Sequence, residues 1–451
     1  MKVLISTWGL PAEWKDVEYN YEDRSARGCS TLQLLEENYD RIFILTLESI
    51  FDYNNDRTRK YDNISKCREC YIENTIRYET ENYKDFIERG ELALTKMIGC
   101  IGLNTDKVKV IILPSIGHPG PTKKFDGNVK NYASVAMVRL FDELMKISDS
   151  EHVEEICLDT SHGLNFMPTI SLDISRFISQ LIFFKQAANS GTKNDGNKIR
   201  FRALNADPLP RIQDYNFLGI NEVLNETINS LPVSLEKDND IYLSSVNGEL
   251  HKDEELKSIY YYIRKVIKSS YYPFPILLGN YSRDIKGIQD MRNKILDKWL
   301  SDTIIDNESI THNGTIGPKF IKDLLTAEVI INVIKSIIGK KDRVSLEDIK
   351  NMNEKVYKSI SEINHVLINQ EISEIEKFYK GNPIHSKELL KMGKMGDSNP
   401  IDEPVKRIMI AHAGFQIGLV YIYPGEPNIS AYSFDYENYK EVLKKTLGKG
   451  I

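Results

Sequence analysis

The segment "EEICLDTSHGLNF", residues 154–166, holds the pattern that decides the fold. Its first part, "EEICLD" (154–159), is a short apolar run that predicts a buried strand. The polar stretch "DTSHGLN" (159–165) follows directly, and we expect an apolar helix to begin near Phe166. A strand, a glycine-containing turn and the N-terminus of a helix together form a cradle for anions, because unpaired backbone N–H groups point toward the ligand.

The rest of residues 1–205 repeats this alternation of strand and helix. The further strand-like runs are "KVLIST" (2–7), "RIFILTL" (41–47), "KVKVIILP" (107–114) and "KIRFRAL" (198–204), and the helical stretches between them include "DFIERGELALTKMIG" (85–99) and "ASVAMVRLFDELMKI" (133–147). Alternation of this kind favours an α/β fold with a mostly parallel, doubly wound sheet.

Beyond this region the sequence becomes mainly helical. The Pro- and Asn-rich segment "NADPLPRIQDYN" (205–216) indicates a domain boundary. Apolar residues at helical spacing predict one helix over 317–339 and a second over 345–368. The second begins with the N-cap candidate Ser345, and Asp348 follows three residues later. A short strand-like run, "GLVYIY", occupies residues 418–423.

We therefore expect three parts. An α/β domain would span residues 1–210, a helical connecting region 211–315, and a mainly α-helical C-terminal domain 316–451.

The composition is that of an ordinary globular protein. Of the 451 residues, 41% are hydrophobic and 27% are charged, and the net charge is −6. No overall basic field indicates nucleic-acid binding, so such a site would need a local patch. The N-terminus "MKVLISTWGLP" lacks the long apolar core of a signal peptide, and no apolar run reaches the length of a membrane span. We expect a cytoplasmic protein without a membrane partner.

Five cysteines lie at positions 29, 67, 70, 100 and 157, and Cys67 and Cys70 form the CxxC motif "CREC". A structural zinc site needs four ligands, and no second CxxC or paired histidines follow at zinc-finger spacing. We expect a disulfide or two free thiols here instead of a metal site.

Polar residues cluster where the predicted strands end, which is where ligands bind in open α/β sheets. The candidate ligand-binding residues are Ser6, Thr7, Trp8, Gly9, Trp14, Ser115, Ile116, Gly117, Asp159, Thr160, Ser161, His162 and Gly163. Neither the GxGxxG of dinucleotide sites nor the GxSxG of a hydrolase elbow is present at these ends.

Alternatives remain open at these positions. "DTSHG" (159–163) is equally typical of a structural turn with an Asp N-cap, and Trp8 or Trp14 would serve the core as readily as a base. If the motif binds a ligand, we expect the Thr160 and Ser161 hydroxyls and the His162 ring to donate to it, and Gly163 to supply a backbone angle that only glycine adopts easily.

The stretch "RIMIAHAG" (407–414) joins a permanent cation, Arg407, to a titratable imidazole, His412. Arg offers a fixed fork to phosphate oxygens, and His has a pKa near neutrality that suits proton transfer. Asp402 and Pro404 are candidates to begin this helix, and Gly414 to end it. The alternative is a buried helix with one charge at its start and a satisfied core histidine.

These motifs resemble a known family. "STWG" (6–9), "LPSIG" (113–117) and "DTSHG" look like the sensor domain of CARF proteins, the CRISPR-associated Rossmann-fold sensors of cyclic oligoadenylates. "RIMIAHAG" resembles the Arg-x4-His motif of HEPN ribonucleases, and the order of the two resembles type III CRISPR ancillary ribonucleases. One departure is Ile408, which stands where many HEPN motifs carry a polar residue.

The resemblance implies a homodimer, or a larger homo-oligomer, with a composite RNA-cutting cleft formed by the Arg407 and His412 of two protomers. It favours cyclic tetra-adenylate as an activator held over the two-fold axis, and single-stranded RNA as the substrate. We expect no cofactor and no catalytic metal, because the 2′-hydroxyl of RNA supplies the nucleophile. The alternative function is a ligand-controlled transcription regulator whose helical half binds DNA, but no basic recognition helix is evident.

Overall fold

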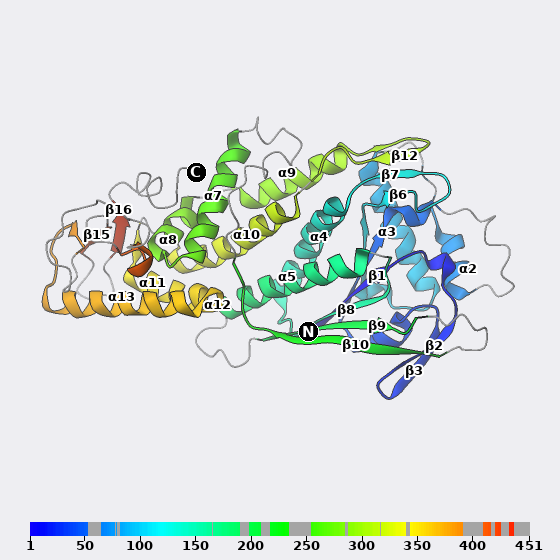
Figure 1. The fold of residues 1–451 in the computed structure, drawn as a ribbon, viewed down its shortest axis with the longest axis horizontal. Coiled ribbons are helices and arrows are strands. Elements are labelled where there is room, and N and C mark those ends of the chain that lie inside the picture. Colours follow the sequence, from blue (N-terminus) through cyan, green and yellow to red (C-terminus); the bar gives the residue numbers. More distant parts are fainter. Residues whose placement is uncertain are drawn as a thin grey trace.

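The computed structural model describes residues 1–52, 65–76, 78, 82–164, 166–189, 198–208, 217–233, 254–284, 287–315, 317–339, 343–390, 409–415, 420–424 and 433–436. It consists of an α/β half and a helical half that lie side by side (Figure 1).

An eight-stranded sheet, ordered β3-β2-β10-β9-β8-β1-β4-β5, forms the centre of the α/β half. Its parallel core consists of β1 (Lys2–Trp8), β4 (Arg41–Leu47), β5 (Val108–Leu113), β8 (Glu155–His162) and β9 (Ile199–Ala206). These are the five strands predicted from the sequence, so the expected α/β fold is confirmed. Their nearly continuous apolar runs follow from burial on both faces, as in other parallel sheets.

Three further strands extend this sheet. β10 (Phe217–Ile228) pairs antiparallel with β9 and parallel with β2 (Val17–Tyr21), which forms a hairpin with β3 (Arg24–Gly28). The sheet therefore continues past the boundary expected at 205–216, and residues 217–228 are a strand instead of part of a helical connection. The sequence concealed β10 because its apolar residues do not alternate regularly with polar ones, and two of them, Phe217 and Val223, are exposed.

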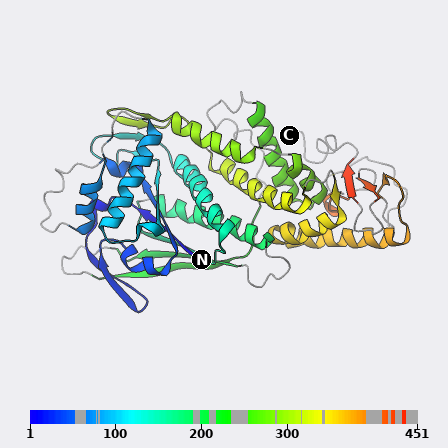
Figure 2. The ribbon, with the colours of Figure 1, turned by 180° about the vertical axis from the view of Figure 1, so that it is seen from behind.

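Helices cover both faces of the sheet. The helices of this half are α1 (Leu32–Leu35), α2 (Lys66–Asn74), α3 (Tyr83–Cys100), α4 (Val129–Ser150) and α5 (Phe166–Asn189). Figures 1 and 2 show α4 and α5 on the side that faces the helical half, and α2 and α3 on the opposite side. This is the doubly wound arrangement.

The helical half comprises α7 (Glu254–Tyr271), α8 (Pro275–Asp284), α9 (Ile288–Ser301), α10 (Pro318–Ile338), α11 (Leu346–Met352), α12 (Lys358–Ile360) and α13 (Glu362–Gly381). A small sheet at its far end consists of β13 (Val344–Ser345), β14 (Glu388–Leu389), β15 (Val420–Tyr423) and β16 (Ser433–Tyr436). The predicted helix over 317–339 and the strand within 418–423 are thus confirmed.

The helix expected over 345–368 is interrupted. Its predicted start is confirmed, because Ser345 and Asp348 form a reciprocal capping box. A π-helical turn (Asn353–Tyr357) then follows, and the chain becomes extended at Ser361, whose side chain caps α13 by accepting from Asn364 N. Ser361 is therefore the N-cap of a second helix. The regular spacing of apolar residues continues across it and did not indicate this break.

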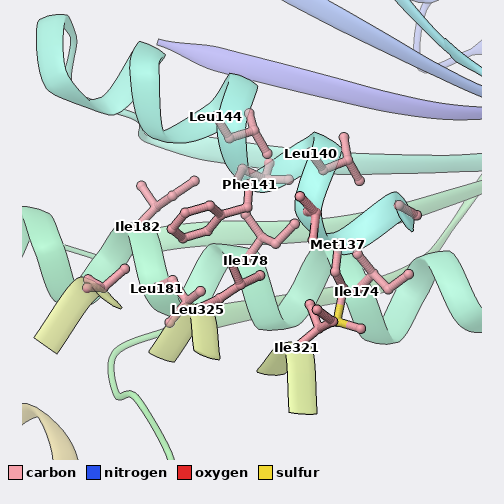
Figure 3. Packing of buried hydrophobic residues seen from close by; sticks show 14 of the residues in the cluster. Met137, Leu140, Phe141, Leu144, Ile174, Ile178, Leu181, Ile182, Ile321 and Leu325 are labelled. Carbon is pink, nitrogen blue, oxygen red and sulfur yellow. The ribbon is translucent and has the colours of Figure 1, made fainter. Parts of the chain in front are cut away.

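The two halves share a hydrophobic core. Figure 3 shows side chains of α4 and α5 meeting Ile321 and Leu325 of α10. Beside this core the buried Arg292 of α9 forms ion pairs with Asp142 of α4 (2.7 Å) and Glu328 of α10 (3.0 Å). Burial raises the pKa of Glu328 to about 7, although Arg292 opposes that shift. The α/β half is therefore packed directly against the helical half.

A second link is a four-stranded sheet made of β6 (Ile116–Gly117), β7 (Lys124–Asp126), β11 (Ile304–Ile305) and β12 (Ser309–Thr311). β12 lies parallel to β7, so a strand that follows α9 hydrogen-bonds to a strand in the segment after β5. This brings residues near 125 and 310 together.

Two disulfides, Cys29–Cys67 and Cys70–Cys100, hold α2 in place. The two cysteines of the "CREC" motif therefore point to different partners, one beyond β3 and one at the end of α3. The expectation that Cys67 and Cys70 form disulfides is confirmed, and the alternative that they are two free thiols is wrong. Cys157 is a buried free thiol.

Within the described ranges, none of the helices has the length and apolarity needed to span a membrane.

Candidate functional site

The carboxylate of Asp159 organises the strand ends. It is fully buried, and its Oδ2 accepts hydrogen bonds from Ser6 Oγ (2.9 Å) and Thr31 Oγ1 (2.7 Å). Its Oδ1 accepts from the backbone N (3.1 Å) and Oγ (2.5 Å) of Ser161. β8 continues to His162, so residues 159–162 are strand and not a turn with an Asp N-cap. Asp159 thus joins β8 to β1 and to the start of α1.

The imidazole of His162 lies in an aromatic corner. It stacks on the Trp14 ring with centroids 4.2 Å apart, and its Nε2 accepts from the backbone N of Thr31 (3.3 Å). The hydroxyl of Tyr19 lies 3.4 Å from the same nitrogen. Burial lowers the pKa of His162 to about 4, and Asp159 opposes that shift only partly. The ring is therefore neutral at physiological pH.

The two tryptophans predicted near β1 have different positions. Trp8 is buried and meets Trp14 edge-on with centroids 4.9 Å apart, so Trp8 belongs to the core. Its indole Nε1 has no hydrogen-bond partner among the described residues. Trp14 is partly buried against that core and carries the stacked His162. Of the two, Trp14 is the one placed to contact a ligand.

Gly9 and Gly163 allow β1 and the end of β8 to approach closely. Gly9 N donates to His162 O (2.7 Å), and Thr7 Oγ1 donates to Asp159 O (3.4 Å). A Cβ on Gly163 would lie 2.4 Å from Thr7 Oγ1. Gly163 is required for this contact and not for an unusual backbone angle, because its φ is not in the left-handed region, and the expected reason is therefore wrong.

The hydroxyls expected to serve as ligand donors are engaged inside the fold. Thr160 Oγ1 donates to Leu204 O (2.9 Å), and Ser161 Oγ donates to Asp159 while it accepts from Ala206 N (2.9 Å). Each hydroxyl has a single hydrogen, which Thr160 donates to β9 and Ser161 donates to Asp159 of its own strand, so both hydrogens are already used. As found, they can offer a ligand acceptor oxygens only.

The residues after β5 belong to a different polar group. Ser115 N donates to Glu48 Oε1 (2.9 Å), and Ser115 Oγ accepts from Ser49 N (2.9 Å). Ile116 and Gly117 form β6, and Gly117 has a φ of 80°. The structure thus brings together the predicted residues of β1 and β8 with Trp14, while Ser115 hydrogen-bonds to Glu48 and Ile116 and Gly117 pair with β7.

Sequence reasoning missed Thr31 and Tyr19, which both contact His162. A signal for Thr31 existed, because Ser30 and Thr31 immediately precede the apolar run "LQLL" (32–35), as helix caps do. Tyr19 had no comparable signal, since its position follows from the pairing of β2 with β10.

At the other end of the molecule, His412 lies at the end of a helical turn. Residues 409–411 are helical, Ala413 has a φ of 46° and Gly414 a φ of 80°, and Gly414 N donates to Met409 O (2.8 Å). These are the features of a left-handed helix end, so Gly414 closes the helix as expected. Asp402, Pro404 and Arg407 lie outside the described residues.

The imidazole of His412 has a carboxylate partner. Its Nδ1 lies 3.2 Å from Oε1 of Glu371, in the middle of α13. The hydrogen bond and charge of Glu371 raise the pKa of His412 above its usual value, against the opposing effect of burial. Glu371 is 41 residues away in sequence, so no local pattern pointed to it.

Among the described residues, no group of three or more His, Cys, Asp and Glu side chains is placed to hold a metal ion. The absence of a catalytic metal stays a prediction.

Comparison with known proteins assigns both regions. Residues 3–208 match the family model of the CARF domain of CRISPR system endoribonuclease Csx1, and residues 361–430 match its HEPN domain. The chain is also 24% identical to the CRISPR system endoribonuclease Csx1 of Methanocaldococcus jannaschii, over 94% of this chain and 86% of that protein. The first match contains the Asp159 cluster, and the second contains Glu371, Arg407 and His412. The chain therefore belongs to the CARF–HEPN family of CRISPR-associated endoribonucleases.

Proposed function

We propose that this protein is an endoribonuclease that cleaves single-stranded RNA without a metal ion and is activated by cyclic tetra-adenylate. The observation that carries the proposal is that the HEPN match, residues 361–430, contains both Arg407 and the carboxylate-paired His412. The same chain carries a CARF match whose strand ends hold a prepared polar and aromatic cluster.

The chemistry requires only proton movement and charge stabilisation. The 2′-oxygen bonds to phosphorus as the bond from phosphorus to the 5′-oxygen breaks, the 2′-hydroxyl loses its proton, and the 5′-oxygen gains one. His412 is suited to carry a proton because imidazole is the side chain that ordinarily titrates near neutral pH. The hydrogen bond to Glu371 raises its pKa and so favours the protonated form. Such help is worth roughly 10²–10⁴ in rate. Arg407 would stabilise the phosphate charge with its fixed cation.

The sensor would hold the ring at the carboxyl ends of β1 and β8. The stacked Trp14–His162 pair offers a flat surface for an adenine, and neutral His162 can contact a base without attracting a counter-ion. Phosphates would lie near the start of α5, where the positive end of the helix dipole favours anions. A ring of four equal units suits the two-fold axis of a homodimer.

Glu48 offers a route from the sensor strands to the helical half. Its fully buried carboxylate, just after β4, accepts from Ser115 N (2.9 Å), from Tyr83 Oη, and from His312 Nε2 (2.8 Å), which follows β12. The His312 ring stacks on Trp299 of α9 with centroids 4.8 Å apart. If bound cyclic tetra-adenylate changes the spacing of the strand ends, this chain of contacts would shift α9. Activation would then be a population shift between two arrangements of the protein.

The transcription-regulator alternative is less well supported, because the region that would read DNA is the one that matches the HEPN ribonuclease domain.

The direct test is incubation of the protein with end-labelled single-stranded RNA in excess EDTA, with and without cyclic tetra-adenylate. We expect cleavage that the ring accelerates, and products that end in a 2′,3′-cyclic phosphate (or its opened form) and a 5′-hydroxyl, identified by mass spectrometry. A strict magnesium requirement or 5′-phosphate ends would contradict the mechanism. Binding of duplex DNA with no RNA cleavage would favour the regulator.

Arg407→Ala and His412→Ala should each lower the cleavage rate at saturating cyclic tetra-adenylate by at least about 100-fold. Arg407→Ala removes the cation that stabilises the phosphate, and His412→Ala removes the group that transfers a proton. Dimerisation and ring binding should stay unchanged, as measured by light scattering and calorimetry. His385→Ala, in the same matched region but on an exposed side chain, serves as the control and should retain activity. Near wild-type cleavage by both catalytic variants would remove the nuclease assignment.

His162→Ala should move half-maximal activation to a ring concentration roughly 10- to 100-fold higher, because it removes part of the surface on which an adenine would stack. Maximal cleavage should change little, since the catalytic groups are untouched. Gly163→Val should have a larger effect because its Cβ would collide with Thr7. The control is Gly99→Ala, inside α3. Unchanged half-activation in His162→Ala and Gly163→Val would place the ring elsewhere.

His312→Phe keeps an aromatic ring against Trp299 but removes the donor to Glu48. If this bond transmits activation, the ratio of ring-stimulated to basal cleavage should fall by roughly 5- to 100-fold, the usual range of coupling between sites. Ring affinity should change much less. Thr303→Val, which removes the neighbouring hydroxyl at Nδ1 and leaves the Glu48 bond, is the matched control. Full stimulation in a folded His312→Phe protein would show that coupling takes another route.

A further inference from the structure

His412 is held by a partner that is itself shielded from water. The Glu371 side chain is 13% exposed and that of His412 is 28% exposed. A carboxylate removed from water to this extent is costly unless it is hydrogen-bonded, and the described part of the chain places the His412 imidazole against it. The contact between Glu371 and His412 is therefore a partly buried hydrogen bond and not a solvent-exposed ion pair.

The pairing determines which imidazole nitrogen can work. An ionised carboxylate only accepts hydrogen bonds, so the Nδ1 that faces Glu371 carries a hydrogen in both the neutral and the protonated ring. The nitrogen that can gain or lose a proton during a reaction is then Nε2. The neutral form is confined to a single tautomer, as in other sites where a carboxylate orients a histidine.

Other carboxylates of the same region serve different contacts. Glu376, also on α13, pairs with Lys350 (2.6 Å). Glu354 lies 3.7 Å from Nε2 of His365, a histidine of α13 that is outside the Arg-x4-His motif. The Glu354–His365 pair gives an internal comparison, because it joins the same two residue types a few turns away.

The backbone also fixes His412. Ala413, directly after it, is fully buried and has a φ of 46°, an angle that is unfavourable for an alanine. The surrounding structure must over-determine this conformation, which is a feature of functional sites.

We infer that Glu371 is a positioning residue for RNA cleavage, which fixes the Nδ1–H tautomer of His412 and presents Nε2 to the scissile phosphate. The inference rests on the proposed function and deepens it, because it assigns a second residue, from a distant element, to the same site. Glu371 does not touch the RNA in this role.

The test is single-turnover cleavage in EDTA with saturating cyclic tetra-adenylate, from pH 5 to pH 9, for wild type, Glu371→Gln, Glu371→Asp and the control Glu354→Gln. Glu371→Gln keeps the shape but loses the charge, so the rate at pH 7 should fall roughly 10- to 100-fold. Because the carboxylate raises the pKa of His412, its loss should also move the limb of the pH profile that reports His412 to lower pH. Glu371→Asp should recover part of the rate, and Glu354→Gln should match wild type.

A second measurement does not depend on cleavage. Diethyl pyrocarbonate modifies neutral imidazoles, so peptide mass spectrometry of His412 labelling against pH reports its pKa. In Glu371→Gln, labelling should persist to lower pH than in wild type, while His365 labelling stays unchanged. Thermal unfolding and ring binding verify that each variant is folded.

The outcomes separate the two levels of the proposal. If wild type cleaves RNA but a folded Glu371→Gln protein has the same rate and pH profile, the positioning role is overturned and the proposed function stands. A His412 labelling curve that does not move in Glu371→Gln would also overturn it. If wild type cleaves no RNA with the ring present, the proposed function fails, and the positioning role falls with it.

Discussion

The buried carboxylate of Asp159 is the constraint on which the sensor end of this protein depends. A charge without access to water is tolerated only when its oxygens are hydrogen-bonded, and four donors from three segments converge on it. They come from β1, the start of α1 and β8 itself. Meeting this single requirement fixes the relative position of three segments and leaves Trp14 and His162 stacked at their edge.

A similar arrangement connects the halves of the molecule. Glu48 stands at the end of a sensor strand, and one of its donors, His312, comes from the segment that follows α9. Arg292 joins α9 to both α4 and α10 beside the apolar contacts of Figure 3. Packed interfaces of this kind tend to have a few discrete arrangements instead of a continuous range, which is what the proposed activation by cyclic tetra-adenylate would require.

Two histidines show how environment assigns opposite roles to one residue type. His162 is partly buried among aromatic rings, and its pKa falls to about 4, so its ring is neutral at physiological pH. His412 is half-buried beside Glu371, whose hydrogen bond and charge raise the pKa of the imidazole and favour its protonated form. The first suits recognition of an uncharged base, and the second suits proton transfer.

The sequence by itself determined the parallel core strands, the capped start of α11 and the residues of both motifs, because these are local patterns of burial, capping and residue type. It did not reveal β10, whose apolar residues do not alternate regularly with polar ones. Only the tertiary structure decided that Gly163 serves a close contact with Thr7, that Thr160 and Ser161 use their hydroxyl hydrogens inside the fold, and that Glu371 faces His412. Each of these depends on the distance between segments that are remote in the chain, and such distances arise only when the helices and sheets pack.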